Sequence, residues 1–515
     1  MAATDTAPTV STSTTTASCW VETGPPAEEG RAPLAGDASA DTVVIGGGIV
    51  GLTAALMLQR AGNSVVLLEA SRIGRQVTGG STAKITSQHG LIYHHLTQRF
   101  GADAAAAYAQ SNEAGLRWIA EQIRERNIDC DYEPRSAYTY ALSDEQAAAV
   151  EREVEAATRA GLPARLVRET ALPFPVRAAV CFDGQAQFHP VKYQAALAAE
   201  FVERGGRLHE STRVVDVEGA RPCTVVTAEG RVRADDVIVA TNIPILDRGG
   251  YFGRAFPYRH LCIAGPVDRE RAPEGMFISA DQPTRSIRSA PWSETERLLV
   301  LIGEAFPTGH ADTEDKLRTL TAYAGEHFGL TEPRFRWGNQ DFYSADRVPY
   351  VGPILPGGSR IRVATGFSAW GITTGTVAAM ILSDDVLGRR NDWATLYDSR
   401  RLGLKGGGMK LVGKNLHVAR SWIGQRLHTP PEKAAASLRP GEAALIRLKG
   451  KPAAAYRDEG GVLHALDARC THMGCHVHWN AAERSWDCPC HGSRFDTDGS
   501  ILHGPAVRAL ARISE

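Results

Sequence analysis

Residues 41–70 begin with Asp-Thr-Val-Val-Ile-Gly-Gly-Gly-Ile-Val-Gly, continue as a helical run and end with Ser-Val-Val-Leu-Leu-Glu-Ala. Gly46, Gly48 and Gly51 therefore follow an apolar strand and open an apolar helix, and Glu69 lies eighteen residues beyond Gly51. In a βαβ unit such glycines allow a pyrophosphate to approach a helix N-terminus, and the acidic residue accepts from a ribose hydroxyl. A glycine-rich turn in an ordinary α/β protein is the alternative. The context favours a dinucleotide-binding domain.

A second stretch, residues 470–492, reads Cys-Thr-His-Met-Gly-Cys, then twelve other residues, then Cys-Pro-Cys-His-Gly. It resembles a Rieske [2Fe–2S] site, in which two cysteines hold one iron and two histidines hold the other. The predicted ligands are Cys470, His472, Cys488 and His491. Structural zinc is the alternative, because zinc accepts the same four ligands. An additional cysteine pair, which zinc would not require, favours the iron–sulfur interpretation.

That additional pair, Cys475 and Cys490, resembles the pair that bridges the two cluster loops as a disulfide in Rieske proteins of the cytochrome bc-complex type. The resemblance implies electron transfer, and a disulfide that burial must protect in a reducing compartment. Ser493 is expected to donate toward a cluster sulfur and to raise the potential. Phe495 stands where high-potential members usually have Tyr, which predicts a lower potential. Residues 504–506, Gly-Pro-Ala, resemble the loop that covers the cluster.

Three further segments resemble the D-amino-acid oxidase and glycine oxidase superfamily of flavoproteins. Residues 78–86 resemble its flavin-side loop, residues 233–242 the strand that returns to the cofactor, and residues 363–375 its C-terminal flavin-binding strand and turn. The resemblance implies FAD, bound by Gly46, Gly48, Gly51, Glu69, Ser81, Thr82, Lys84, Gly366, Gly371 and Thr374. No second Gly-x-Gly-x-x-Gly follows a plausible strand, so a separate nicotinamide domain is not expected.

The length of 515 residues is too great for a single core, and the motifs give the domain boundaries. An α/β FAD-binding (Rossmann-like) domain with an α+β substrate subdomain is predicted over residues 39–400. A small all-β Rieske domain is predicted over residues 433–515. Residues 1–38, rich in Thr, Ser, Ala and Pro, are expected to be largely disordered, although Cys19 and Trp20 could dock onto the body.

Periodicity predicts several elements inside these domains. Helices are expected near residues 102–126 and 143–160, and short strands at residues 443–448 and 453–457. Residues 401–432 form a basic linker, whose predicted helix at 415–427 could lie on a membrane surface but is favoured to pack between the two domains.

Charge and hydropathy argue against two classes of partner. A net charge of −1 argues against nucleic acid. The chain has no stretch of eighteen apolar residues and no apolar run suited to a signal peptide. We therefore expect no integral membrane segment, and a cytoplasmic protein.

The substrate is approached through residues 341–352, Asp-Phe-Tyr-Ser-Ala-Asp-Arg-Val-Pro-Tyr-Val-Gly. In the amino-acid oxidases that this segment resembles, an Arg that grips the substrate carboxylate is expected where Asp341 stands here. Asp341 would repel a carboxylate and could pair a cationic amine, or it could be purely structural. Arg347 could restore anion binding from another angle. The candidate pocket residues, for each of which core packing is the alternative, are Asp341, Tyr343, Arg347, His89 and Trp370.

The two expected cofactors together predict a reaction class. A flavin exchanges electrons in pairs or singly, whereas a [2Fe–2S] cluster accepts one. We predict a dehydrogenase that takes a hydride from an amine or amino acid, as the superfamily resemblance implies, and passes single electrons to an external carrier. The alternatives are a reductase or oxygenating enzyme with inward electron flow, an oxidase that uses O₂, and a non-catalytic redox sensor.

Overall fold

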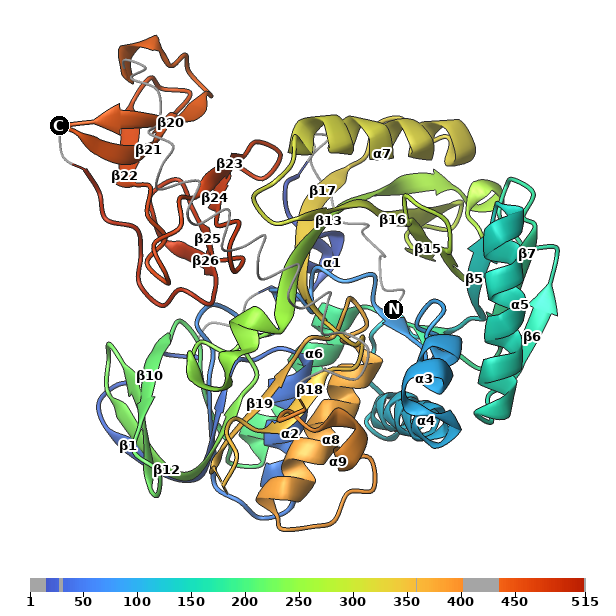
Figure 1. Ribbon diagram of the computed structural model, residues 1–515, viewed down its shortest axis with the longest axis horizontal. Coiled ribbons are helices and arrows are strands. Elements are labelled where there is room, and N and C mark those ends of the chain that lie inside the picture. Colours follow the sequence, from blue (N-terminus) through green and yellow to red (C-terminus); the bar gives the residue numbers. More distant parts are fainter. Residues whose placement is uncertain (1–14, 27–30, 358, 402–434, 514–515) are drawn as a thin grey trace, which may run out of the picture.

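The computed structural model describes residues 15–26, 31–357, 359–401 and 435–513. Figure 1 shows two sheets with their helices, which together form the large domain, and a small β module at the C-terminal end. We call residues 435–513 the C-terminal module. Among the described residues, none of the helices is long and apolar enough to cross a bilayer.

The first sheet is built on parallel strands in the order β19-β12-β1-β2-β9. Its strands are β1 (Ala38–Ile45), β2 (Val65–Leu68), β9 (Arg207–His209), β10 (Val214–Glu218), β11 (Cys223–Thr227), β12 (Arg231–Val239), β18 (Tyr350–Pro353) and β19 (Ile361–Thr365). Buried apolar runs occupy Val43–Ile45 of β1, all of β2 and Val237–Val239 of β12, as expected where a parallel sheet is covered on both faces. Three helices pack together beside it, with α2 contacting both others: α2 (Ile49–Arg60), α6 (Pro190–Glu203) and α8 (Thr373–Val386).

The second sheet has eight strands in the order β17-β13-β16-β15-β14-β5-β7-β6. They are β5 (Ala137–Ala141), β6 (Ala164–Val167), β7 (Ala178–Phe182), β13 (Ala255–Asp268), β14 (Met276–Ser279), β15 (Ser286–Pro291), β16 (Glu296–Pro307) and β17 (Phe335–Ser344). The predicted helices are confirmed as α4 (Ala102–Glu125) and α5 (Asp144–Arg159); Ser143 caps α5 by accepting from Gln146 N. Helix α7 (Thr313–Phe328) packs against β13 and β16.

Several short elements lie outside the two sheets. They are α3 (Tyr93–Phe100), α9 (Ala394–Tyr397), the strands β3 (Lys84–Ile85), β4 (Glu133–Pro134) and β8 (Ala186–Gln187), and the 3-10 turns η1 (Arg248–Gly253) and η2 (Arg269–Arg271). Strand β8 pairs with both β3 and β4. Strand β3 lies in the predicted flavin-side loop. Its pairing with β8 holds this loop near β4, which directly precedes strand β5 of the second sheet.

The C-terminal module consists of two small antiparallel sheets. The first contains β20 (Ala443–Leu448), β21 (Lys451–Arg457) and β22 (Leu463–Asp467), preceded by the turn η3 (Ala435–Ser437). The second contains β23 (His478–Asn480), β24 (Ser485–Asp487), β25 (Arg494–Phe495) and β26 (Ile501–His503). The two strands predicted in this module are confirmed as β20 and β21. A core that includes Cys470, Cys475, Cys488 and Cys490 joins the two sheets.

The N-terminal segment that was expected to be disordered is partly ordered in the structure. Residues 15–26 of the expected disordered segment have a defined structure, with helix α1 (Cys19–Thr23) packed against α6. Cys19 and Trp20 are buried, and the Trp20 indole N–H donates to Ser81 O at 2.8 Å. Aromatic burial and this hydrogen bond outweigh the polar composition of the segment. The linker helix predicted at residues 415–427 lies outside the described residues.

The C-terminal module docks against strands β13 and β17 of the large domain. Arg259 on β13 is fully buried and forms ion pairs with Glu483 and Asp487 of the module. On β17, the Gln340 amide donates to Gly492 O at 2.8 Å. A buried charge that loses its partners is strongly destabilising, so these ion pairs favour the docked arrangement.

Candidate functional site

A cavity of about 920 Å³ lies between the two sheets and reaches the C-terminal module. Seven of the predicted FAD-binding residues line it: Gly46, Gly48, Glu69, Ser81, Thr82, Lys84 and Gly371. All five candidate pocket residues line it as well: His89, Asp341, Tyr343, Arg347 and Trp370. The structure therefore brings together segments that are separated by more than 300 residues in the chain.

The glycine-rich turn between β1 and α2 has no room for side chains on its inner side. Gly46 has φ +103°, and a Cβ there would lie 2.6 Å from Ala240 O. A Cβ on Gly51 would lie 1.9 Å from Gly46 O, so Gly51 allows the helix to approach the turn rather than lining the cavity. A Cβ on Gly48 would point toward Thr78 Oγ1 at 3.3 Å and narrow the cavity itself. This is the backbone arrangement that a pyrophosphate at a helix N-terminus requires.

Glu69 lies at the end of β2, beside this turn. Its carboxylate accepts from Gly47 N and from Ser71 N, both at 2.7 Å. Burial raises the pKa of Glu69, and these two backbone donors oppose the rise. A carboxylate has about four acceptor positions, so two remain for ribose hydroxyls. The geometry thus fits the predicted role of Glu69.

Two other predicted FAD-binding residues, Gly366 and Thr374, do not line the cavity. Gly366 has φ +81° at the turn after β19, which favours glycine. The Thr374 hydroxyl donates to Asn112 Oδ1 at 3.0 Å and so connects α8 to α4. With Gly51, these residues shape the backbone around the cavity.

Lys84 is a buried cation in the cavity wall. Its ammonium donates to Phe277 O at 2.7 Å, across to the second sheet. Burial, and secondarily the nearby Arg288 guanidinium, lower the pKa of Lys84 to about 7. A lysine amine with one carbonyl partner retains further N–H groups that can donate to a bound molecule.

The structure places Asp341 in the cavity wall with both carboxylate oxygens bound to backbone. Asp341 accepts from Phe342 N at 2.8 Å and from Ala369 N at 2.5 Å. It therefore ties β17 to the turn that follows β19. Burial raises the pKa of Asp341 to about 6. Of the two alternatives, these contacts favour the structural role.

His89 and Trp370 stack, with ring centroids 4.8 Å apart. His89 Nε2 lies 2.8 Å from Thr86 O, and Nδ1 lies 2.7 Å from the Tyr108 hydroxyl. Because a carbonyl only accepts, Nε2 carries the proton and Tyr108 donates to Nδ1. Burial lowers the pKa of His89 to about 3. His89 is thus a neutral residue that supports the Trp370 ring.

Tyr343 contacts two further cavity residues, Tyr258 and His260, which the sequence did not predict. Its hydroxyl lies 2.8 Å from His260 Nε2, and its ring meets Tyr258 edge to face at 5.2 Å. Tyr258 and His260 also line the cavity, from strand β13. Burial, with a contribution from Arg259, lowers the pKa of His260 to about 4. Their spacing of two residues in a strand, which puts both on one face, is the signal that could have found them.

Arg347 has a backbone φ of +68°, in the left-handed region that non-glycine residues seldom adopt. Its side chain lines the cavity, and a guanidinium nitrogen lies 3.5 Å from Leu91 O. Strained backbone is often found at functional sites. Arg347 thus remains available to meet an anionic group.

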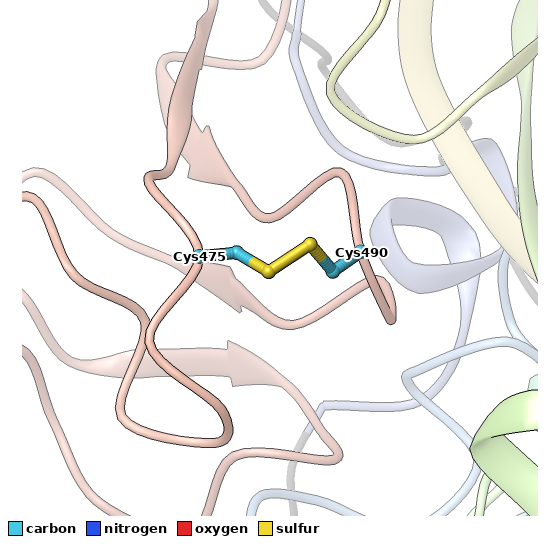
Figure 2. Close-up of a disulfide and its surroundings, with 2 residues drawn as sticks. All are labelled: Cys475 and Cys490. Carbon is cyan, nitrogen blue, oxygen red and sulfur yellow. A yellow bond between two sulfur atoms is a disulfide. The ribbon is translucent and has the colours of Figure 1, made fainter. Parts of the chain in front are cut away.

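The predicted cluster ligands meet where two loops of the C-terminal module approach each other. The Cys470 and Cys488 thiols share a hydrogen bond, which lowers the pKa of Cys470 to about 6. The His472 and His491 rings are perpendicular, with centroids 5.0 Å apart. Figure 2 shows the Cys475–Cys490 disulfide spanning the two loops, with Cα atoms 6.5 Å apart. The Cys488 sulfur lies within 4.8 Å of both disulfide sulfurs.

The hydrogen bonding of the two histidines fits metal ligation. His491 Nδ1 is buried and has no hydrogen-bond partner. The Nε2–H of His472 donates to Asp247 Oδ1 at 2.7 Å, so Nδ1 is the ring nitrogen of His472 that would ligate a metal. One ring nitrogen from each imidazole, together with the two thiols, matches the two-plus-two ligand set.

The residues expected to tune the cluster lie close to it. Ser493 is fully buried; its oxygen accepts from Ala506 N at 3.0 Å, and its hydroxyl hydrogen-bonds the Cys470 sulfur, which helps to lower the pKa of Cys470. Phe495 is also fully buried, on β25 opposite Trp486. The 504–506 loop is therefore joined to the cluster site through Ser493.

Comparison with known proteins identifies the two parts. The family model described as FAD dependent oxidoreductase matches residues 41–385, and the Rieske [2Fe-2S] domain model matches residues 429–514. The chain belongs to the FAD-dependent oxidoreductase family. This FAD-dependent oxidoreductase carries a C-terminal Rieske domain and has FAD and a [2Fe–2S] cluster as its cofactors. The predicted fold class and cofactors are confirmed, and the zinc alternative is set aside.

Similar proteins were found among both curated sequences and solved structures. The oxidoreductase is 35% identical to the putative Rieske 2Fe-2S iron-sulfur protein YhfW of Bacillus subtilis, over 93% of this chain and 94% of that one. It is 26% identical to the gamma-glutamylputrescine oxidoreductase of Escherichia coli, over 67% of this chain and 83% of that one. The structure of glycine oxidase from Geobacillus kaustophilus matches with a TM-score of 0.58 at 18% identity, over 71% of this chain and 99% of that one. The last likeness shows the fold alone.

Proposed function

We propose that this FAD-dependent oxidoreductase is a dehydrogenase of a small amine or amino-acid-like substrate, whose electrons leave through the Rieske cluster to an external one-electron carrier. The observation that carries the proposal is that residues 501–504 of the C-terminal module form part of the cavity wall. The cluster module and the cavity therefore share a boundary.

The contacts at this boundary are direct. The Gln340 amide donates to Gly492 O, next to the cluster ligand His491, and lies 3.3 Å from His503 Nδ1. His503 lines the cavity, is half-buried, and stacks on Phe342 with centroids 6.0 Å apart. A packed route of side chains and backbone thus connects the cavity to the cluster loop.

The electron balance follows from the two cofactors. FAD can accept a hydride, whereas the cluster transfers one electron at a time. Oxidation of a C–N bond removes two electrons and two protons from the substrate, so two equivalents of a one-electron carrier are reduced for each turnover. Arg347 and the His260–Tyr343 pair are the polar groups of this chain that we propose orient the substrate, whereas Lys84 is proposed to contact FAD.

The carrier is proposed to approach an exposed part of the cluster module. The His472 side chain is only 5% exposed because the large domain covers it, whereas the neighbouring Met473 is 45% exposed. Met473 directly follows His472, so a carrier that bound over this exposed side chain would lie close to the predicted cluster ligands.

Anaerobic mixing with a panel of amines and amino acids tests the proposal. For a substrate, we expect bleaching of the flavin absorbance followed by reduction of the cluster, and slow turnover with O₂ as the acceptor. Cluster reduction before flavin reduction, by a reduced ferredoxin and without any substrate effect, would support the inward route instead. No response to any compound would favour the sensor.

A further inference from the structure

A carboxylate from the large domain reaches a ligand of the cluster. Asp247 precedes η1, and its Oδ1 accepts the Nε2–H of His472 at 2.7 Å. The two residues are separated by 225 positions in the chain. Asp247 belongs to neither the Rieske motif nor the flavin motifs, and sequence patterns alone give no sign of it.

The segment that carries Asp247 begins at the cavity. Thr241, Asn242 and Ile245, which follow β12, line the cavity wall. Five residues after Asn242, the same stretch of backbone presents the Asp247 carboxylate to the cluster module. The Asn242 side chain also donates to Gln340 O at 3.2 Å, which fixes this stretch to β17. One short segment therefore contacts both redox sites.

An aromatic ring completes the contact. Phe252, at the end of η1, meets the His491 ring edge to face at 5.2 Å and the His472 ring at 6.1 Å. The His472 side chain is 5% exposed, whereas Asp247 is 60% exposed. The imidazole is thus shielded from water while its carboxylate partner remains hydrated.

We propose that Asp247 is a positioning residue through which the large domain orients His472 and sets the cluster potential. A carboxylate on the outer nitrogen of a ligating imidazole fixes the tautomer and ring orientation and makes the ligand more basic. Its negative charge also disfavours the electron that the cluster gains. Asp247 therefore lowers the reduction potential of the cluster and holds the imidazole with Nδ1 toward the iron.

The proposal is tested by a redox titration of the full chain that is followed by electron paramagnetic resonance. Asp247→Asn should shift the midpoint potential to more positive values, because the negative charge is removed. Asp247→Ala should shift it in the same direction and broaden the signal, because the ring orientation is no longer fixed. Asp247→Glu, which keeps the charge, should restore the potential toward that of the wild type.

Asp268→Asn is the matched control, since Asp268 is an exposed carboxylate at the far end of β13, beside Arg271. Iron, sulfide and FAD contents of each variant are measured first. Loss of the cluster from Asp247→Asn and Asp247→Ala but not from Asp247→Glu would also support the positioning role. Equal potentials in the wild type, Asp247→Asn and Asp247→Ala would overturn the proposal, as would an equal shift in the control. The readout depends on neither the substrate nor the direction of electron flow.

Discussion

The cluster site and the flavin cavity are built in opposite ways. The predicted cluster ligands all come from residues 470–491, on two loops of one small module that a disulfide joins. The cavity wall is drawn from segments between Ile45 and Gly504, including both sheets and the module itself. The first site is local and the second is assembled by the whole fold. Substitutions should therefore act separately on the two sites, except where the module meets the large domain.

Loss of FAD without loss of the cluster is the largest expected effect. Gly48→Val should abolish flavin retention, because the added side chain enters the cavity where the backbone must approach the pyrophosphate. Iron and sulfide should remain at two each per chain. Flavin absorbance and metal analysis of the purified protein measure both. Gly460→Val, in an exposed turn of the module, is the control and should keep both cofactors.

If Gly48→Val retained full FAD, the assignment of this turn would be wrong. If it lost the cluster as well, the two sites would not be separable in the way described.

Removal of the disulfide should affect the cluster site alone. Replacing both Cys475 and Cys490 by Ser opens a loop of sequence separation 15, which corresponds to about 3 kcal/mol of module stability. The urea midpoint for loss of cluster absorbance should fall while FAD content stays unchanged. Cys223→Ala, in the first sheet, should leave that midpoint at the wild-type value. A midpoint unchanged by the double substitution would show that the loops are held by other contacts.

The buried amine of Lys84, in the cavity wall, should make the free energy of unfolding depend on pH. Burial lowers its pKa to about 7, from an ordinary value of 10.5. The cost of burying the ammonium is fully present below pH 7 and disappears as pH rises toward 10.5, because the unfolded chain binds a proton there that the folded chain does not.

Lys84→Met should therefore stabilise the protein at pH 6 by on the order of 2 kcal/mol, after the lost hydrogen bond is subtracted. The gain should shrink as pH rises toward 10. The gain in stability is measured from thermal midpoints of proteins with the same FAD occupancy. Lys451→Met, at an exposed position, is the control. If the difference in thermal midpoint between Lys84→Met and the wild type did not change with pH, the lowered pKa of Lys84 would be contradicted.

The smallest expected effects concern the cluster potential. Ser493→Ala should lower it and Phe495→Tyr should raise it, because each hydroxyl stabilises the cluster that carries the extra electron. The wild-type value should lie in the Rieske range of about −150 to +300 mV, below its upper end. Film voltammetry of the full chain compares the three proteins. Identical potentials would mean that neither side chain faces the cluster.

The local site was predictable from sequence and the assembled one only in part. The ligand spacing predicted four residues that the structure brings together, and the glycine motif with Glu69 predicted residues that line one end of the cavity. Tyr258, His260 and Asp247 were missed because their partners lie on other strands or in another domain. Asp341 was recognised as unusual, but its hydrogen bonds to Phe342 and Ala369 become visible only when β17 and the turn after β19 are placed together.

The contact between the two sites is the central feature of this molecule, and the proposed function requires electron transfer across it within one chain. Laser-flash photoreduction of the bound FAD under anaerobic conditions tests it without a substrate. We expect the flavin to lose its electron to the cluster with a first-order rate constant that is independent of protein concentration. A rate proportional to protein concentration, or a cluster that dithionite reduces but the photoreduced flavin does not, would contradict the account.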